Sequence, residues 1–379
     1  ILTRDWSSDV CSSDLFYQDN YWVSLFLAIT TMVTWGSNKI AVKYLTYPVA
    51  MYTIDYFTWV FIFHVILGFT MGADWFPPKK GEGMISNFVD IFKHNPKSLI
   101  IQKISGPIVA GISTTAFSLI MFVLTDGYGL TSAIPLLFGS AMLLGVIATY
   151  YLEPKGDPTY IFTGVAILFV AVIMNTIAST MNNNRKKQEQ EKEKPLLEEG
   201  TAAVDVEEKP KTNSMCLFVV LGIAGAIFDF FYGPCTSLGN KQPYPMSAYG
   251  VFLLCSFASV VTVYPLAYIV MRHPLKGPKC TMKEYFSATW KQRWPAIWSA
   301  FLLAVGNFCY ASTGGSLGYA ISYSLSRGTL LVSALWGIFY YHEFRGANCK
   351  TWTTQLSALY FFVARSEERR VGKECRSRW

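Results

Sequence analysis

Charged residues and histidine are scarce in this 379-residue chain, and the motifs of most energy-coupled enzymes are missing. Charged residues make up 15% of the sequence, and there are four histidines. The sequence contains no G-x-x-x-x-G-K-[ST] phosphate loop, no G-x-G-x-x-G after a predicted strand, no HExxH and no catalytic Ser/His/Asp order. It therefore gives no support to an ATP-driven pump or an intramembrane enzyme, and it predicts no cofactor and no metal site.

Paired cysteines are also missing. Outside the two ends of the chain there are six cysteines without a C-x-x-C pair, most of them in apolar runs: Cys216, Cys235, Cys255, Cys280, Cys309 and Cys349. This scatter favours small apolar packing residues over a disulfide framework or a metal site.

The two ends of the chain differ from the rest in character. Residues 5–15 resemble the translation of a sequencing-library adapter, and residues 365–379 resemble that of the partner adapter. We expect residues 1–15 and 365–379 to be artefacts and exclude them from the fold, the alternative being genuine polar termini. Without them 25 basic and 19 acidic residues remain, a net charge of +6. Much of the basic charge lies in three loops, which indicates contact with a lipid bilayer rather than with nucleic acid.

Long apolar stretches, in contrast, are abundant. The hydrocarbon core of a bilayer, about 30 Å thick, needs about 20 apolar residues of helix. On this count we expect an all-α, multi-pass integral membrane protein of a plasma or internal membrane, with ten transmembrane helices of which the tenth is truncated. The expected spans are Tyr21–Lys39, Val49–Met71, Ser105–Leu124, Tyr128–Tyr151, Tyr160–Thr180, Met215–Tyr232, Ala248–Met271, Pro295–Tyr310, Leu317–Tyr341 and Thr351–Ala364.

A polar segment, residues 182–214, divides these spans into two groups of five. It carries seven Lys/Arg and eight Asp/Glu and has almost nothing that could fill a core. We interpret it as a water-exposed cytoplasmic linker between a first repeat, residues 16–181, and a second repeat, residues 215–364. In each half a long loop follows the second span. The loop after Met71 has five lysines, and the loop after Met271 is basic as well.

Short matches at constant offsets indicate that the halves are copies. At an offset of 197, Gly36 matches Gly233, Tyr47-Pro48 matches Tyr244-Pro245, and Tyr52 matches Tyr249. At an offset of 190, residues 150–156 match residues 340–346. Five spans per half is an odd number, so the halves insert in opposite orientations and form a 5+5 inverted repeat. The charge of the loops favours a cytoplasmic linker and non-cytoplasmic termini, although the lysine-rich loop after the second span argues the other way.

Two motifs give the chain a family resemblance. Tyr52-Thr53-Ile54-Asp55-Tyr56-Phe57 is similar to the aspartate motif in the second span of the ureide permeases, and the sequence from Thr329 to Ile338, followed by Glu343 and Arg345, resembles their ninth-span signature. The chain also resembles the wider superfamily of ten-span drug/metabolite transporters. This resemblance implies secondary-active, proton-coupled uptake of allantoin, uracil or related nitrogen-rich heterocycles.

Two departures from the family pattern bear on the substrate. Gly36 follows Trp35 where the family has proline, and Arg327 stands where it has an uncharged amide. Carriers of sugars or nucleotide sugars in the same superfamily therefore stay open as an alternative. A membrane scaffold or receptor without transport activity is an alternative of a different class.

Charged residues within the spans are the first candidates for a site, because a charge in the bilayer is costly unless it is paired or hydrated. We predict that Asp55, and less strongly Asp229, couples transport to protons, the alternative being a structural ion pair. Arg327 can hold a substrate carbonyl, carboxylate or phosphate, or form a salt bridge with Asp55 or Asp229. An Asp55–Arg327 pair that opens on binding would unite both interpretations.

Interrupted helices and polar side chains complete the predicted site. Gly36-Ser37-Asn38 and Tyr232-Gly233-Pro234 are expected to be equivalent interruptions whose free backbone groups can bind substrate, or else plain helix ends. The substrate-binding candidates besides Arg327 are Asn38, Tyr232, Asn307 and Tyr310, each of which can instead be a contact between helices. His64 is interpreted as a packing residue. The expected partners are a small-molecule substrate, protons and lipid.

Overall fold

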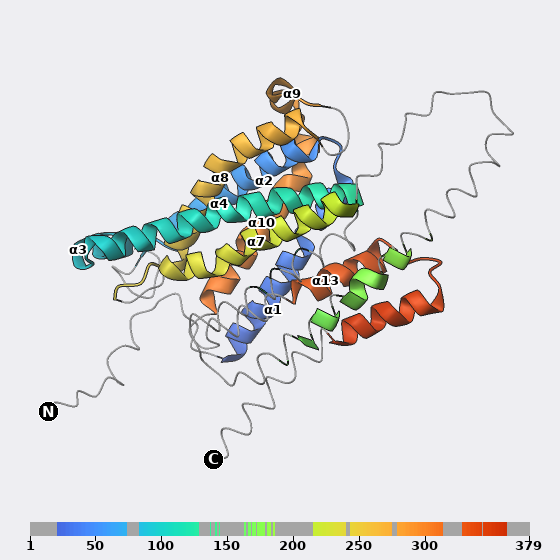
Figure 1. Ribbon diagram of the computed structural model, residues 1–379. Helices are drawn as coiled ribbons and strands as arrows, with labels where there is room; N and C mark the ends of the chain where they lie inside the picture. Colours follow the sequence, from blue (N-terminus) through green and yellow to red (C-terminus); the bar gives the residue numbers. More distant parts are fainter. Residues whose placement is uncertain are drawn as a thin grey trace, which may run out of the picture.

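The computed structural model describes residues 21–73, 83–128, 215–239, 243–274, 279–313, 328–342 and 344–361, with scattered residues between 137 and 185. All regular elements in these ranges are helical. Five of the helices are long and apolar enough to cross a bilayer. The last four of them lie side by side in an elongated bundle, and the first lies at a steep angle to these four (Figure 1). The multi-pass membrane architecture expected from the apolar spans is therefore confirmed.

The first half begins with α1 (Tyr21–Ser37), a 3-10 turn η1 (Ile40–Tyr44) and α2 (Val49–Phe69). Pro48 stands immediately before α2, where its missing N–H costs no hydrogen bond and its fixed φ suits a helix start. The predicted second span agrees with α2 to within two residues. The loop predicted after it is partly wrong, because it contains the helix α3 (Met84–His94). A longer helix than expected follows, α4 (Lys97–Tyr128).

The second half follows the same order. Its elements are α7 (Met215–Gly239), α8 (Ala248–Arg272), the short α9 (Met282–Ser287), α10 (Trp290–Ser312), α13 (Thr329–Leu335) and the π-helical turn η2 (Trp336–Tyr340). Residues 349–361 are also helical. The predicted fourth span lies almost wholly outside the described residues, and the fifth and ninth do so in part. In Figure 1, α3 and α9 lie at different ends of the bundle.

Antiparallel packing of α2 against α8 forms the centre of the bundle. Phe61 contacts Phe257, His64 stacks on Phe252, and a Cβ on Gly72 would meet Tyr249, so residue numbers rise along α2 as they fall along α8. Around this pair, α4 packs on α7 and α8, while α10 packs on α1 and α2. Most of the buried core residues of α2 form one cluster with the C-terminal end of α8 and the start of α10.

One predicted interruption is wrong. Helix α7 continues through Tyr232-Gly233-Pro234 to Gly239, although Pro234 lacks an N–H to donate. The Thr236 hydroxyl donates to the carbonyls of Tyr232 and Gly233, both at 2.9 Å. In the first half α1 ends at Ser37 and a 3-10 turn follows, so Gly36-Ser37-Asn38 marks the end of a helix, which was the alternative interpretation of this segment.

Close helix crossings depend on small residues. A Cβ on Gly106 of α4 would lie 2.5 Å from the carbonyl oxygen of Cys235 and 2.7 Å from the Leu238 side chain, both on α7. We expect Gly106→Val to push α4 away from α7 and to destabilise the protein by about 1–3 kcal/mol, the usual range for overpacking. Thermal unfolding in detergent measures the change. Ser105→Val, at the exposed neighbouring position, is the control, and equal stability of the two variants would contradict this packing.

Candidate functional site

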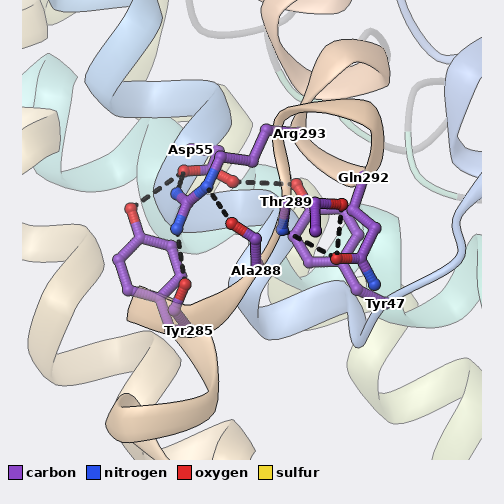
Figure 2. A network of polar contacts seen from close by, with 7 residues as sticks. All are labelled: Tyr47, Asp55, Tyr285, Ala288, Thr289, Gln292 and Arg293. Atoms are coloured by element: carbon purple, nitrogen blue, oxygen red, sulfur yellow. Dashed lines mark hydrogen bonds and ion pairs between the residues drawn. The ribbon is translucent and has the colours of Figure 1, made fainter.

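A buried polar network holds Asp55 near the start of α2. Its carboxylate forms an ion pair with Arg293 at 2.5 Å and accepts hydrogen bonds from the hydroxyls of Tyr47, at 3.0 Å, and Tyr285, at 2.8 Å (Figure 2). Asp55 is only 2% exposed. Tyr47 and Asp55 belong to the first half and Tyr285 and Arg293 to the second. The network therefore joins the two halves.

The start of α10 places Arg293 in this network. The Thr289 N–H donates to the Gln292 side chain at 2.8 Å, which caps the helix one turn before Pro295. Arg293 then donates to the carbonyls of Tyr285, at 2.5 Å, and Ala288, at 3.3 Å, and its guanidinium lies over the Tyr285 ring, 4.5 Å from the centroid. Figure 2 shows the guanidinium between Asp55 and Tyr285. With its donors directed by α9 and α10, Arg293 has little freedom to turn elsewhere.

The two tyrosines of the network act as donors. Burial, followed by the nearby charge of Asp55, raises the pKa of Tyr47, and the same causes in the same order raise the pKa of Tyr285. Both phenols therefore keep their protons at physiological pH. Asp55 accepts from both of them while it pairs with Arg293, which satisfies most of its acceptor sites.

A separate cavity of about 90 Å³ lies between the halves. This is several times the ~10–15 Å³ that one water molecule needs. Its lining comes from α1, α2, α4, α7, α8, α10 and α13. On α2 it is lined by Tyr56, Phe57, Val60 and His64, which follow one face of the helix, and not by Asp55.

Most of the predicted site residues gather at this cavity. Asn38, Asp229, Tyr232 and Asn307 line it. Tyr310 is not part of the lining, but its ring packs against the lining residue Trp35 at a centroid distance of 5.5 Å.

Two predicted residues lie elsewhere. Asp55 belongs to the separate network with Arg293. Arg327, its expected partner, lies outside the described residues. Among the described residues Asp55 pairs with Arg293, and the predicted Asp55–Arg327 pair remains a prediction because Arg327 is not among them.

Five polar atoms around the cavity have no hydrogen-bond partner among the described residues. They are Trp35 Nε1, Asn38 Oδ1, His64 Nδ1, Thr114 Oγ1 and Thr329 Oγ1. Buried polar groups are rarely left unpaired, because each costs about 1–3 kcal/mol. Their concentration at one cavity, beside the aromatic rings of Trp35, Tyr56, Phe57 and Phe117, indicates a site for a flat solute with both donors and acceptors.

His64 packs between helices, as the sequence predicted, and also lines the cavity. Its Nε2 lies 3.4 Å from the Asn307 amide nitrogen, so the amide donates and the ring proton resides on Nδ1. The ring stacks on Phe252 at 5.6 Å. His64 also lines a second, smaller cavity with Tyr249 and Phe308, and so stands between the two cavities.

The end of α1 is held by the ninth-span motif. Ser333 donates to the Gly36 carbonyl at 3.1 Å, and Trp336 Nε1 donates to the Ser37 hydroxyl at 2.9 Å. Gly36 is required here, because a Cβ would lie 2.5 Å from the Val332 side chain. These contacts fix the point at which α1 ends, and therefore the direction of Asn38 and Lys39 toward the cavity.

Sequence reasoning missed two residues of these sites. Arg293 was assigned to a basic loop, yet it lies within the first turn of α10. The Thr289-x-x-Gln292 capping pattern, which precedes Pro295, was the signal that extends the helix back far enough to include it. Lys39 is buried and lines the cavity, and its place at the end of the first span gave no comparable signal.

Comparison with known proteins links the chain to one family of membrane proteins. Residues 198–366 match the family model described as Ureide permease. The chain resembles the ureide permease family. Ureide permease 2 of Arabidopsis thaliana is 24% identical over 322 residues, which cover 73% of this chain and 79% of that protein. Ureide permease 1 of the same plant is 29% identical over 182 residues, 44% of this chain and 46% of that protein.

A more distant match reaches beyond the plant ureide permeases. Transmembrane protein 144 homolog B of Dictyostelium discoideum is 24% identical over 146 residues, 38% of this chain and 37% of that protein. Ureide permeases are multi-pass membrane transporters and not enzymes. The residues matched by the family model include Asp229, Tyr232, Arg293 and Asn307.

The Asp55–Arg293 pair provides a direct test of the network. Removing one partner of a buried ion pair leaves an uncompensated charge and typically costs about 3–5 kcal/mol. We expect Asp55→Asn and Arg293→Gln each to destabilise the protein strongly, and the double variant to lose much less than the sum of the two. Thermal or denaturant unfolding in detergent gives the coupling energy.

Asp90→Asn is the matched control, because the Asp90 side chain is 51% exposed and its salt-bridge partner is the nearby His94. It should have little effect. Additive losses in the double variant would show that the two charges do not depend on each other.

Proposed function

We propose that this protein is a secondary-active transporter of a small, polar, nitrogen-rich metabolite, a ureide such as allantoin or a uracil-like heterocycle, and that it is driven by protons. The observation that carries this proposal is the set of unpartnered polar atoms around the central cavity. Trp35 Nε1 is a donor, Asn38 Oδ1 is an acceptor, and the threonine hydroxyls are both. Amide and ureido groups offer the complementary C=O and N–H groups, and a flat ring stacks on the neighbouring aromatic side chains.

The proposed architecture is a 5+5 inverted repeat, with residues 16–181 and 215–364 as the repeats and 182–214 as the linker. The packing supports it. If α1 corresponds to α7 and α4 to α10, then the contact of α1 with α10 corresponds to the contact of α4 with α7. The contacts of α2 with α10 and of α4 with α8 correspond in the same way. The antiparallel α2–α8 pair would then lie on the pseudo-twofold axis.

In this proposal the coupling role falls first to Asp229. Asp229 lines the cavity, so a proton carried there would lie close to the substrate. Asp55 is a second coupling candidate that would act from outside the cavity, through its contacts with Arg293. A carrier of this kind would expose the cavity alternately to the two sides of the membrane.

Uptake into proteoliposomes tests the proposed function. We expect radiolabelled allantoin or uracil to accumulate when the source side is acidic, and to accumulate less at equal pH. Asp229→Asn should abolish the response to the proton gradient, because the neutral amide cannot exchange a proton. Arg272→Gln, at the exposed last residue of α8, is the control.

Two results would redirect the proposal. Transport that persists without a pH gradient and requires substrate on both sides would favour an exchanger of sugars or nucleotide sugars. Absence of transport of all these compounds, by protein that is correctly inserted, would favour a scaffold.

Trp35→Phe tests the cavity as the binding site. The substitution removes the unpartnered indole N–H and keeps an aromatic ring. Because a hydrogen bond contributes about 0.5–1.5 kcal/mol, we expect the KM for uptake to rise between about twofold and tenfold, with a smaller change in maximal rate. Trp59→Phe is the matched control, since Trp59 contacts Phe63 and Trp290 away from the cavity lining. Equal KM values for the two variants would place the substrate elsewhere.

A further inference from the structure

We propose that Arg293 and Lys103 are equivalent latches, each of which closes one end of the central cavity by joining the two halves of the protein. Release of the Arg293 latch opens the end that carries α9, and release of the Lys103 latch opens the end that carries α3. This inference rests on the proposed function as a transporter. It adds two residues that control access to the cavity without touching the substrate.

Lys103 is a buried cation with partners in the other half. Its side chain is inaccessible to solvent, at 0% exposure, within α4 of the first half. The ammonium donates to the carbonyls of Pro243 at 2.5 Å and Tyr244 at 2.6 Å, in the segment that leads into α8. From the sequence we expected this lysine in the lysine-rich loop between the second and third spans. A buried ammonium with carbonyl partners is instead a fixed contact between elements.

The segment that accepts from Lys103 is built for this contact. Tyr244 has φ of 52°, in the left-handed region that few residues other than glycine adopt. The His94 ring stacks on the Tyr244 ring at 4.8 Å, and Asn87 donates to the Pro245 carbonyl and accepts from the Ser247 N–H. Residues of α3 and α4 thus hold the start of α8 from the first half.

The two latches occupy matching positions in the two halves. Lys103 and Arg293 differ by 190 residues, which is the offset that relates residues 150–156 to residues 340–346. Lys103 lies near the start of α4 and Arg293 near the start of α10, and these are the third predicted spans of their halves. Each reaches the region around the start of the second span of the opposite half, where Tyr47 and Tyr244 correspond at the offset of 197.

The latches lie at opposite ends of the bundle. Because α2 and α8 are antiparallel, the start of α2, next to Arg293, lies beside the end of α8. The start of α8, next to Lys103, lies beside the end of α2. The cavity is lined by α2 at Tyr56 and His64 and by α8 at Cys255 and Ser259. On each helix the lining residues follow the residues at the nearby latch. Because the helices are antiparallel, the cavity lies between the two latches.

The cavity contains a native reporter of access, the free thiol of Cys255, which is buried in the lining. We would reconstitute the protein in one orientation in sealed vesicles and add a membrane-impermeant thiol reagent to one side at a time. Mass spectrometry of the Cys255 peptide gives the rate of labelling, independently of exposed cysteines such as Cys349. No substrate is required.

We expect Arg293→Gln to increase Cys255 labelling several-fold from the side that carries α9, and Lys103→Gln to do so from the opposite side. Arg272→Gln is the control for Arg293→Gln, and Lys97→Gln is the control for Lys103→Gln. Each control removes an exposed cation at the same end of the bundle as its latch and should leave labelling unchanged. Tyr285→Phe removes one hydrogen bond to Asp55 and leaves the ion pair in place. It should give a smaller increase from the α9 side, and it serves where Arg293→Gln does not fold.

Increased labelling from the same side in both latch variants, or unchanged labelling in folded protein, would overturn the proposal. The outcome is separate from that of the uptake experiment. A protein that fails to transport allantoin or uracil can still show labelling from opposite sides, which would retain the latches and discard the substrate. Uptake of allantoin or uracil with unchanged labelling would retain the proposed substrate and discard the latches.

Discussion

The buried ion pair between Asp55 and Arg293 is the contact on which the arrangement of the two halves depends. A charge removed from water needs a partner of opposite charge and further hydrogen bonds, or its burial is strongly unfavourable. Here the carboxylate comes from the first half and the guanidinium from the second, while Tyr47 and Tyr285 satisfy the remaining acceptor sites. Neither half can satisfy its buried charge alone, so the start of α2 and the start of α10 are fixed relative to each other.

Contacts made by buried or partly buried cations join the two halves on either side of the cavity. At the α3 end, Lys103 binds the carbonyls that precede α8, and at the α9 end Arg293 binds Asp55. Between these contacts the lining combines aromatic rings with polar atoms that lack partners among the described residues. A solute can therefore bind to polar groups that have no partner in the protein. The contacts outside the site keep the halves together while it does so.

The sequence predicts the helices of this protein better than it predicts their partners. The bounds of α2 follow from Pro48 and an uninterrupted apolar run, and the polar residues at the cavity stand out because they are rare within spans. The partner of Asp55 was not predictable from hydropathy, because Arg293 lies in a stretch of mixed polarity where only a capping pattern places it in α10. The continuity of α7 through Pro234 was missed because a Tyr-Gly-Pro sequence within a span was interpreted as an interruption, and the structure shows a helix that continues to Gly239.

The site is less symmetric than the bundle around it. Helix α1 ends at Ser37 and directs Asn38 and Lys39 to the cavity, whereas α7 remains helical beyond Tyr232. Four of the five unpartnered atoms at the cavity belong to the first half: those of Trp35, Asn38, His64 and Thr114. The match to the family model covers residues 198–366, in the second half. The match to Ureide permease 2 covers 73% of the chain and therefore extends into the first half as well, so the resemblance is not confined to the half that has fewer unpartnered groups at the cavity.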